Sequence, residues 1–241
     1  MAWASISRAV RDGRPVLIKA TDYDARMEAD GLRALAEAGA PTPAVLVADE
    51  DRVVMEEVDG PEAWEELGAA LARCHGATAE AYGYHRDNVL GPLPQVNTWT
   101  HSWPDFYFRH RLSPFLDELP SELAGPIREA AEDGRMADLL EHGQAPSLVH
   151  GDLWSGNIVA GRWLIDPAVH YADRELDAAF AAVFGGIPER MWQAYQEVWP
   201  FDDGWEERRP ALQLYHLLVH VRLFGGGYTR MVADRLHTLG W

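Results

Sequence analysis

The chain has 241 residues, of which 47% are hydrophobic, and this size and composition predict a compact fold with a sizeable core. It carries 38 acidic and 21 basic residues, a formal net charge of −17, which argues against nucleic-acid binding because such binding needs clustered Lys and Arg. No apolar run approaches the roughly 18 residues of a membrane helix, and no secretory signal is recognisable, so we expect a cytoplasmic protein without a membrane partner.

A short apolar strand is predicted over residues 15–20, and it contains Lys19, the only lysine in the chain. The run Val-Leu-Ile-Lys resembles the V-A-I-K strand, whose lysine contacts nucleotide phosphates. A compact ammonium group suits that role better than a planar guanidinium does, and all other basic residues are arginines. The alternative is a solvated lysine at the end of a strand.

Residues 25–38 carry apolar side chains at helical intervals, with Glu28 in the first turns. Glu28 is therefore the candidate ion-pair partner of Lys19. A glutamate early in a helix also suits the helix dipole alone, so its position next to a lysine strand is what makes it a candidate.

A hairpin is predicted over residues 44–48 and 52–57, and Val58 follows it. This arrangement resembles a kinase hinge, in which backbone groups from about Glu56 to Val58 would bond adenine and Met55 would close the back of the pocket. An ordinary edge strand explains the same residues.

Most of the remaining chain shows helix-like apolar spacing, which predicts a mainly helical second part. The stretches are residues 106–119, 124–140, 175–184, 191–198 and 205–224. The glycines at 225–227 are expected to stop the last of these helices. The single cysteine, Cys74, lies in another apolar helical stretch, so a buried thiol is expected and no internal disulfide can form.

The most informative stretch is His-Gly-Asp-Leu-Trp-Ser-Gly-Asn at residues 150–157. Asp152 and Asn157 are five positions apart, as are the catalytic Asp and the metal-binding Asn of the kinase loop H-R-D-x-x-x-x-N. Two short strands joined near Gly161 would return Asp166 toward Asn157. Asn157 and Asp166 would then hold Mg²⁺ on the phosphates of ATP, and Asp152 would accept the proton of the attacking hydroxyl. Turn chemistry alone is the alternative.

Two other groups of polar residues are assigned structural roles. Asp173, Glu175 and Asp177 form an acidic cluster that resembles the block after the metal-binding Asp in kinases of this kind, and this likeness implies that Asp177 holds the catalytic loop through hydrogen bonds. His216 and His220 have the i, i+4 spacing of metal ligands, but no glutamate follows His216 as the H-E-x-x-H motif requires. We therefore expect these histidines to pack or to lie at the surface.

Together these blocks resemble the fructosamine kinase (ketosamine-3-kinase) family, a branch of the protein-kinase-like fold that aminoglycoside phosphotransferases share. The likeness runs from about Ser5 to the end of the chain, and the Leu-Trp-Ser-Gly insert in the catalytic loop separates this family from other small-molecule kinases. Further matching blocks lie at residues 87–88, 91–99, 103–107, 109–112, 166–168, 173–177, 184–186 and 223–228.

The resemblance implies an α+β, two-lobed protein-kinase-like fold. Its N-lobe, residues 1–59, would hold a small antiparallel sheet, and its larger C-lobe, residues 60–241, would be mainly helical. Relatives have an extra strand and a Gly-Gly loop before the segment that matches residues 5–10, where this chain has Met-Ala-Trp-Ala. We therefore expect the first strand and the glycines of the lobe to be missing, which would leave the phosphates less covered.

The resemblance also implies ATP- and Mg²⁺-dependent phosphorylation of the 3-hydroxyl of a ketosamine, such as a fructosamine or ribulosamine adduct of a free amine or a protein lysine. The phosphorylated adduct is unstable, so the outcome is deglycation. Trp154 would offer an apolar platform to the sugar, although packing explains this tryptophan as well. Two alternatives stay open: a kinase of the same fold for another hydroxylated amine, such as an aminoglycoside or choline, and a nucleotide-binding pseudokinase that regulates a partner. The sugar, the amine and the oligomeric state are left open.

Overall fold

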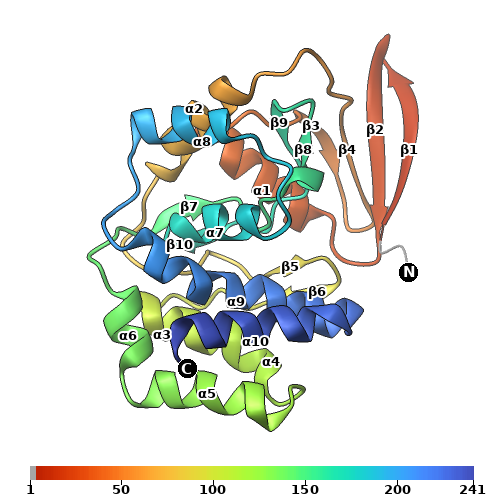
Figure 1. Ribbon diagram of the computed structural model, residues 1–241. Coiled ribbons are helices and arrows are strands. Elements are labelled where there is room, and N and C mark those ends of the chain that lie inside the picture. Colours follow the sequence, from red (N-terminus) through yellow and green to blue (C-terminus); the bar gives the residue numbers. More distant parts are fainter. Residues whose placement is uncertain (1–3) are drawn as a thin grey trace.

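The computed structural model describes residues 4–241, so the predictions for residues 1–3 lie outside the described range. An antiparallel sheet opens this range, and within it one strand precedes the strand of Lys19. Its strands run in the order β1-β2-β4-β3 (Figure 1). They are β1 (Ala4–Arg11), β2 (Arg14–Thr21), β3 (Val45–Ala48) and β4 (Arg52–Glu56).

Helix α1 (Arg26–Glu37) connects β2 to β3 and packs against the sheet. Ala29 and Leu32 of α1 form one buried apolar cluster with Val53 and Met55 of β4. The apolar side chains of α1 recur at helical intervals on one face, and burying that face fixes the helix on the sheet that carries Lys19.

The rest of the described chain is mainly helical, as the periodicity predicted, and it makes up the left and lower parts of Figure 1. Its helices are α2 (Trp64–His75), α3 (Trp103–Tyr107), α4 (Ser113–Leu116), α5 (Ser121–Glu132), α6 (Arg135–Leu140), α7 (Glu175–Phe184), α8 (Glu189–Val198), α9 (Trp205–Phe224) and α10 (Gly227–Leu239). Helix α2 packs against α8, and α9 packs against α7 and α10. Cys74 is buried in α2, as expected.

The helices predicted over 106–119 and 124–140 are divided differently in the structure. The predicted helix over 124–140 is interrupted at Gly134, whose φ of +90° ends one helical run and starts the next. The helix predicted from residue 106 begins at Trp103, because the Ser102 hydroxyl accepts a hydrogen bond from the Asp105 N–H and caps it. A π-helical turn (Phe108–Leu112) comes next, before α4.

Helix α10 was not predicted. The glycines at 225–227 do end α9 as expected, but Gly225 and Gly226, with φ of +63° and +56°, turn the chain into a new helix. A run of glycines signals the end of a helix but carries no information about the type of the next element.

Three short antiparallel pairs complete the fold. They are β5 (Asn88–Leu90) with β6 (Leu93–Gln95), β7 (Ser147–Val149) with β10 (His170–Ala172), and β8 (Ile158–Val159) with β9 (Trp163–Leu164). The β8–β9 hairpin is the one predicted near Gly161. Its central residues Ala160 and Gly161 both have positive φ, which is the geometry of a tight type I′ turn.

The sheet part and the helical part are packed together. Leu35 and Ala40 belong to an apolar cluster that is otherwise built from residues after Gly60. Gly31 of α1 also lies against Pro167 and Val169, where an added Cβ would be 3.0 Å from Pro167 Cγ. The division into lobes of residues 1–59 and 60–241 stays a prediction. Within residues 4–241, no helix is both long and apolar enough to cross a membrane.

Candidate active site

One pocket of about 240 Å³ collects most of the sequence-predicted site residues. Its lining comes from β2 and the loop after it, α1, β5 and the turn after it, the loop after β7, the segment after β9, and α9. The predicted site residues that line it are Lys19, Glu28, Asp152, Trp154, Asn157 and Asp166. The pocket thus joins the lysine strand to the catalytic loop.

The loop after β7 requires a glycine at position 151. Gly151 has a φ of +80°, and a Cβ there would lie 2.1 Å from the Ala168 carbonyl oxygen. The buried carboxylate of Asp177 accepts hydrogen bonds from the N–H groups of His150 (2.6 Å) and Gly151 (2.9 Å). The hydrogen-bonding role expected for Asp177 is therefore present, and it fixes the backbone that leads to Asp152.

His150 links the catalytic loop to the segment that carries Asp166. Its Nε2–H donates to the Ile165 carbonyl oxygen at 2.9 Å, and its Nδ1 accepts from the Asp152 N–H at 3.2 Å. Burial lowers the pKa of His150, so the ring is neutral and this proton arrangement is stable. His150 thereby fixes the backbone of Asp152 relative to that of Ile165, the residue before Asp166.

Asp152 and Asn157 meet as their spacing predicted. The Asn157 Nδ2 donates to both the carbonyl oxygen and the Oδ2 of Asp152, each at 2.9 Å. Burial, with a smaller contribution from the Asp166 carboxylate, raises the pKa of Asp152 to about 7, and the hydrogen bond from Asn157 opposes the rise. A carboxylate with a pKa near neutrality is suited to accept a proton from a hydroxyl group.

Lys19 is the cation of the site. Its Nζ lies 2.7 Å from the carboxylate of Glu28 and 2.8 Å from Oδ1 of Asp166, so the pairing expected between Lys19 and Glu28 is present. Burial disfavours the ammonium form, but the two carboxylates outweigh it and raise the pKa of Lys19. Tyr23, which the sequence analysis did not select, lines the pocket and donates its hydroxyl hydrogen to Glu28 at 3.0 Å.

The residues around Asn157 and Asp166 fit a magnesium ion by their chemistry. Asn157 Oδ1 and Asp166 Oδ2 accept no hydrogen bond from residues 4–241, although the other side-chain polar atom of each is engaged. The Asp166 side chain is 42% exposed, so its free oxygen can reach a ligand. Mg²⁺ binds through one or two carboxylate or amide oxygens together with waters and phosphates, which matches this donor set.

The predicted adenine-binding residues Met55, Glu56 and Val58 do not line this pocket. Met55 is buried in the cluster beneath α1. The Glu56 N–H donates to the Ala44 carbonyl oxygen at 3.0 Å, so that donor is not free for a ligand. The Val58 N–H has no backbone partner among the described residues. Of the predicted hinge residues, Val58 therefore still has a backbone donor that could bond adenine.

Trp154 lines the pocket with 37% of its surface exposed. Its indole lies over Gly156, where an added Cβ would be 2.3 Å from the ring. The edge of Trp154 meets Phe184, with the two ring centroids 6.1 Å apart. The side chain is thus held in place with part of its surface open to the pocket.

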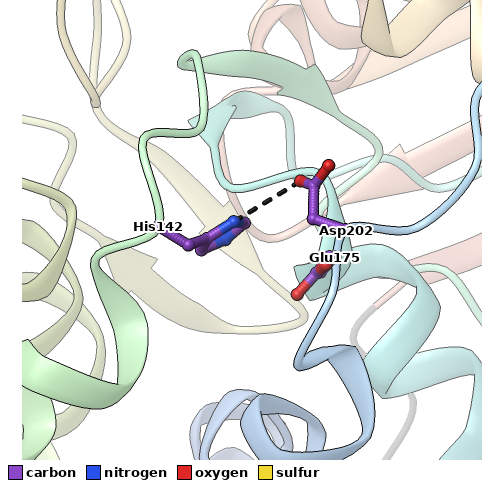
Figure 2. A group of neighbouring side chains, drawn as sticks. All are labelled: His142, Glu175 and Asp202. Atoms are coloured by element: carbon purple, nitrogen blue, oxygen red, sulfur yellow. Dashed lines mark ion pairs between the residues drawn. The ribbon is translucent and has the colours of Figure 1, made fainter.

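A second group of ionisable residues lies outside the pocket (Figure 2). His142, Glu175 and Asp202 have the residue types of a metal site, and His142 Nδ1 lies 3.4 Å from Asp202. Glu175, however, is paired through both oxygens with Arg208, at 2.7 and 2.8 Å. His142 Nε2 bonds Asp173 at 2.9 Å. These contacts make the group an ion-pair network that joins the loop after α6 to α7 and α9.

His216 of α9 packs, as predicted. His216 is buried, its Nε2–H donates to the Gly151 carbonyl oxygen at 2.8 Å, and its ring stacks on Phe180 at 3.8 Å. Burial lowers the pKa of His216 to about 3, so it stays neutral. Helix α9 is thereby attached to the catalytic loop.

The sheet with its lysine, the glutamate of α1 and the loop of Asp152 and Asn157 define a two-lobed protein of the protein-kinase-like class. A family model described as Fructosamine kinase matches residues 15–239, and the chain belongs to this family. A Thermobifida fusca protein assigned as a fructosamine-3-kinase has a crystal structure that superimposes with a TM-score of 0.87 at 35% identity, covering 98% of this chain and 93% of that one.

Curated relatives agree with this assignment. A probable ketoamine kinase of Synechocystis sp. is 40% identical over 182 residues, which are 73% of this chain and 61% of the relative. One of Thermus thermophilus is 36% identical over 230 residues, 92% of this chain and 86% of the relative. The chain thus spans less than two thirds of the length of several curated relatives that it matches.

Proposed function

We propose that this protein transfers the γ-phosphoryl group of ATP to the 3-hydroxyl of a ketosamine and so starts the deglycation of the amine. The observation that carries the proposal is the meeting of Asp152, Asn157 and Asp166 with the Lys19–Glu28 pair around one pocket. The acceptor class is supported by membership in the family and by the names of its relatives, among them ketoamine kinases.

Each residue has a role that follows from its contacts. Lys19, held by Glu28, would contact the α- and β-phosphates of ATP. Asn157 and Asp166 would hold Mg²⁺, which when bound neutralises charge on the phosphate oxygens. Asp152 would accept the proton of the 3-hydroxyl while that oxygen forms a bond to the γ-phosphorus and the bond to the bridging oxygen of ADP breaks.

The remaining predicted contacts are with the adenine of ATP and with the sugar of the ketosamine. Val58 would offer a backbone donor to adenine near Met55 and Glu56. Trp154 would place its open indole surface against the sugar, since aromatic faces pack on the apolar face of a sugar ring. The ketosamine is a free or a protein-bound adduct in this proposal, and a cytoplasmic location stays a prediction.

The test is mass spectrometry of synthetic fructosyl-lysine and ribulosyl-lysine incubated with the purified protein, ATP and Mg²⁺. We expect one added phosphoryl group, located on the 3-oxygen by ³¹P–¹H correlation spectroscopy. The Asp152→Asn protein is the matched control and should transfer far less. If the wild-type protein binds nucleotide but transfers nothing to either adduct, the proposal is wrong.

A further inference from the structure

Helix α9 carries a second histidine, His220, one turn beyond the histidine that bonds the catalytic loop. His216 Nε2–H donates to the Gly151 carbonyl oxygen, next to Asp152. One helical turn advances about 5.4 Å, so His220 is displaced by about that distance along the helix. His220 lines the same pocket as Asp152 and Trp154.

The proton position on His220 is fixed by its own helix. Its Nδ1 lies 2.7 Å from the His216 carbonyl oxygen. Because a carbonyl oxygen only accepts, Nδ1 carries the proton, and in a neutral ring Nε2 then has a free lone pair. Nε2 has no hydrogen-bond partner among residues 4–241 and is not among their fully buried unsatisfied atoms.

The surroundings of His220 are aromatic. Phe184 and Tyr228 have ring centroids 5.0 and 4.9 Å from that of His220, and Phe180 and Phe224 lie at 5.9 and 5.5 Å. Burial among these rings lowers the pKa of His220. A ring packed in this way keeps its orientation and presents a neutral acceptor to the pocket.

We infer that Nε2 of His220 accepts a hydrogen bond from a ketosamine hydroxyl other than the one that is phosphorylated, and so determines which acceptors bind productively. This inference rests on the proposed function. A neutral acceptor does not suit a phosphate group as the ligand, because the phosphate oxygens of ATP are themselves acceptors near pH 7. Sugar hydroxyls are donors, and a site built to bond a hydroxyl discriminates strongly against analogues that lack it.

The test compares two variants with a matched control. His220→Phe keeps an aromatic ring and removes the acceptor, and we expect it to raise the KM for the ketosamine about tenfold with little change in the KM for ATP. His220→Gln places an amide oxygen near the position of Nε2 and should recover most of the loss. His237→Phe, on the exposed side of α10, should behave as wild type.

Ketosamines that lack one hydroxyl at a time, at positions other than the third, separate recognition from packing. Wild-type protein should lose about tenfold in kcat/KM toward one of them, and His220→Phe should show no loss toward that same analogue. Two results with an active wild type would overturn this inference and leave the proposed function standing. In the first, His220→Phe keeps the wild-type KM for the ketosamine. In the second, His220→Phe loses the same factor in kcat/KM toward every analogue. A wild type that transfers nothing to the parent ketosamines overturns both.

Discussion

The Nζ atom of Lys19 lies 2.8 Å from Oδ1 of Asp166, a residue 147 positions further along the chain. This contact ties β2 to the segment after β9, and the same ammonium group is shared with Glu28. Lys19 is 7% exposed and Glu28 is 4% exposed, so their charges are balanced inside the protein rather than by water. Lys19 therefore contributes to stability as well as to the proposed nucleotide site.

Lys19→Met should lower the free energy of unfolding by about 3 kcal/mol near pH 7, because it leaves the Glu28 carboxylate buried without a cation. The loss should shrink as the pH falls, because burial raises the pKa of Glu28 and a protonated Glu28 needs no cation. Urea denaturation followed by tryptophan fluorescence measures the free energy of unfolding at each pH. The double variant Lys19→Met/Glu28→Gln removes both charges and should recover part of the loss; a double variant no more stable than Lys19→Met would contradict the explanation.

Asp152→Asn should lower kcat by about 10²- to 10⁴-fold, since an amide cannot accept the hydroxyl proton. The Asn157 Nδ2 can still donate to the amide oxygen and to the backbone carbonyl of position 152, so the loop should keep its conformation. Nucleotide binding, measured by isothermal titration calorimetry with ATP and Mg²⁺, should be retained.

Asp166→Ala should instead abolish the Mg²⁺ dependence of nucleotide binding, because it removes one of the two proposed metal ligands. Calorimetric titrations with ATP, with and without Mg²⁺, should give the same weak affinity in this variant. If Asp152→Asn and Asp166→Ala have the same effect on binding and on rate, the separate roles given to the two carboxylates are wrong.

Asp177→Asn should cost stability before it costs chemistry. The buried carboxylate accepts from two backbone N–H groups, and the amide nitrogen of Asn would face one of them. We expect a loss of about 2–3 kcal/mol in the free energy of unfolding, with kcat within a few-fold of wild type at temperatures where the variant is folded. Asp234→Asn, on the exposed surface of α10, is the control. A large fall in kcat with unchanged stability would count against the bracing role.

The stabilisation contributed by His142 should depend on pH. Burial disfavours its charged form, but the hydrogen bond and charge of Asp173 outweigh that effect and raise the pKa of His142 above 6.5. Its contribution is then fully present below the ordinary pKa and is lost as the pH rises through the raised one. The difference in unfolding free energy between wild type and His142→Gln should be larger at pH 6 than at pH 9, and a constant difference would contradict this.

The parts of the site that sequence analysis predicted depend on short stretches of chain. Asp152 and Asn157 are five residues apart, and the turn at Ala160 and Gly161 sets the return of the chain toward Asp166. Local spacing and turn chemistry carry this information. The bounds of α7 and α9 were predicted for the same reason, since the apolar periodicity of each helix is continuous and ends at a glycine.

The parts that were missed depend on contacts between distant segments. The sequence indicated Glu28 as a partner of Lys19, but it cannot show that Asp166 shares the same ammonium group. The hydrogen bond from the Glu56 N–H to the Ala44 carbonyl oxygen depends on how the end of β4 lies beside the residues before β3. Residue types do not specify that arrangement. Tyr23 was missed because a tyrosine in a short loop has no pattern that separates it from other surface residues.

The close contact of Gly31 with Pro167 bears on how the proposed kinase activity can be controlled. In many protein kinases, movement of the helix that carries the glutamate turns activity on and off. Here that helix rests directly on the Asp166–Pro167 segment, so withdrawing Glu28 from Lys19 would also separate α1 from its neighbours and expose apolar side chains. We therefore expect the Lys19–Glu28 pair to be present with and without nucleotide, so that under the proposed function the rate would follow the supply of glycated amines rather than a movement of α1.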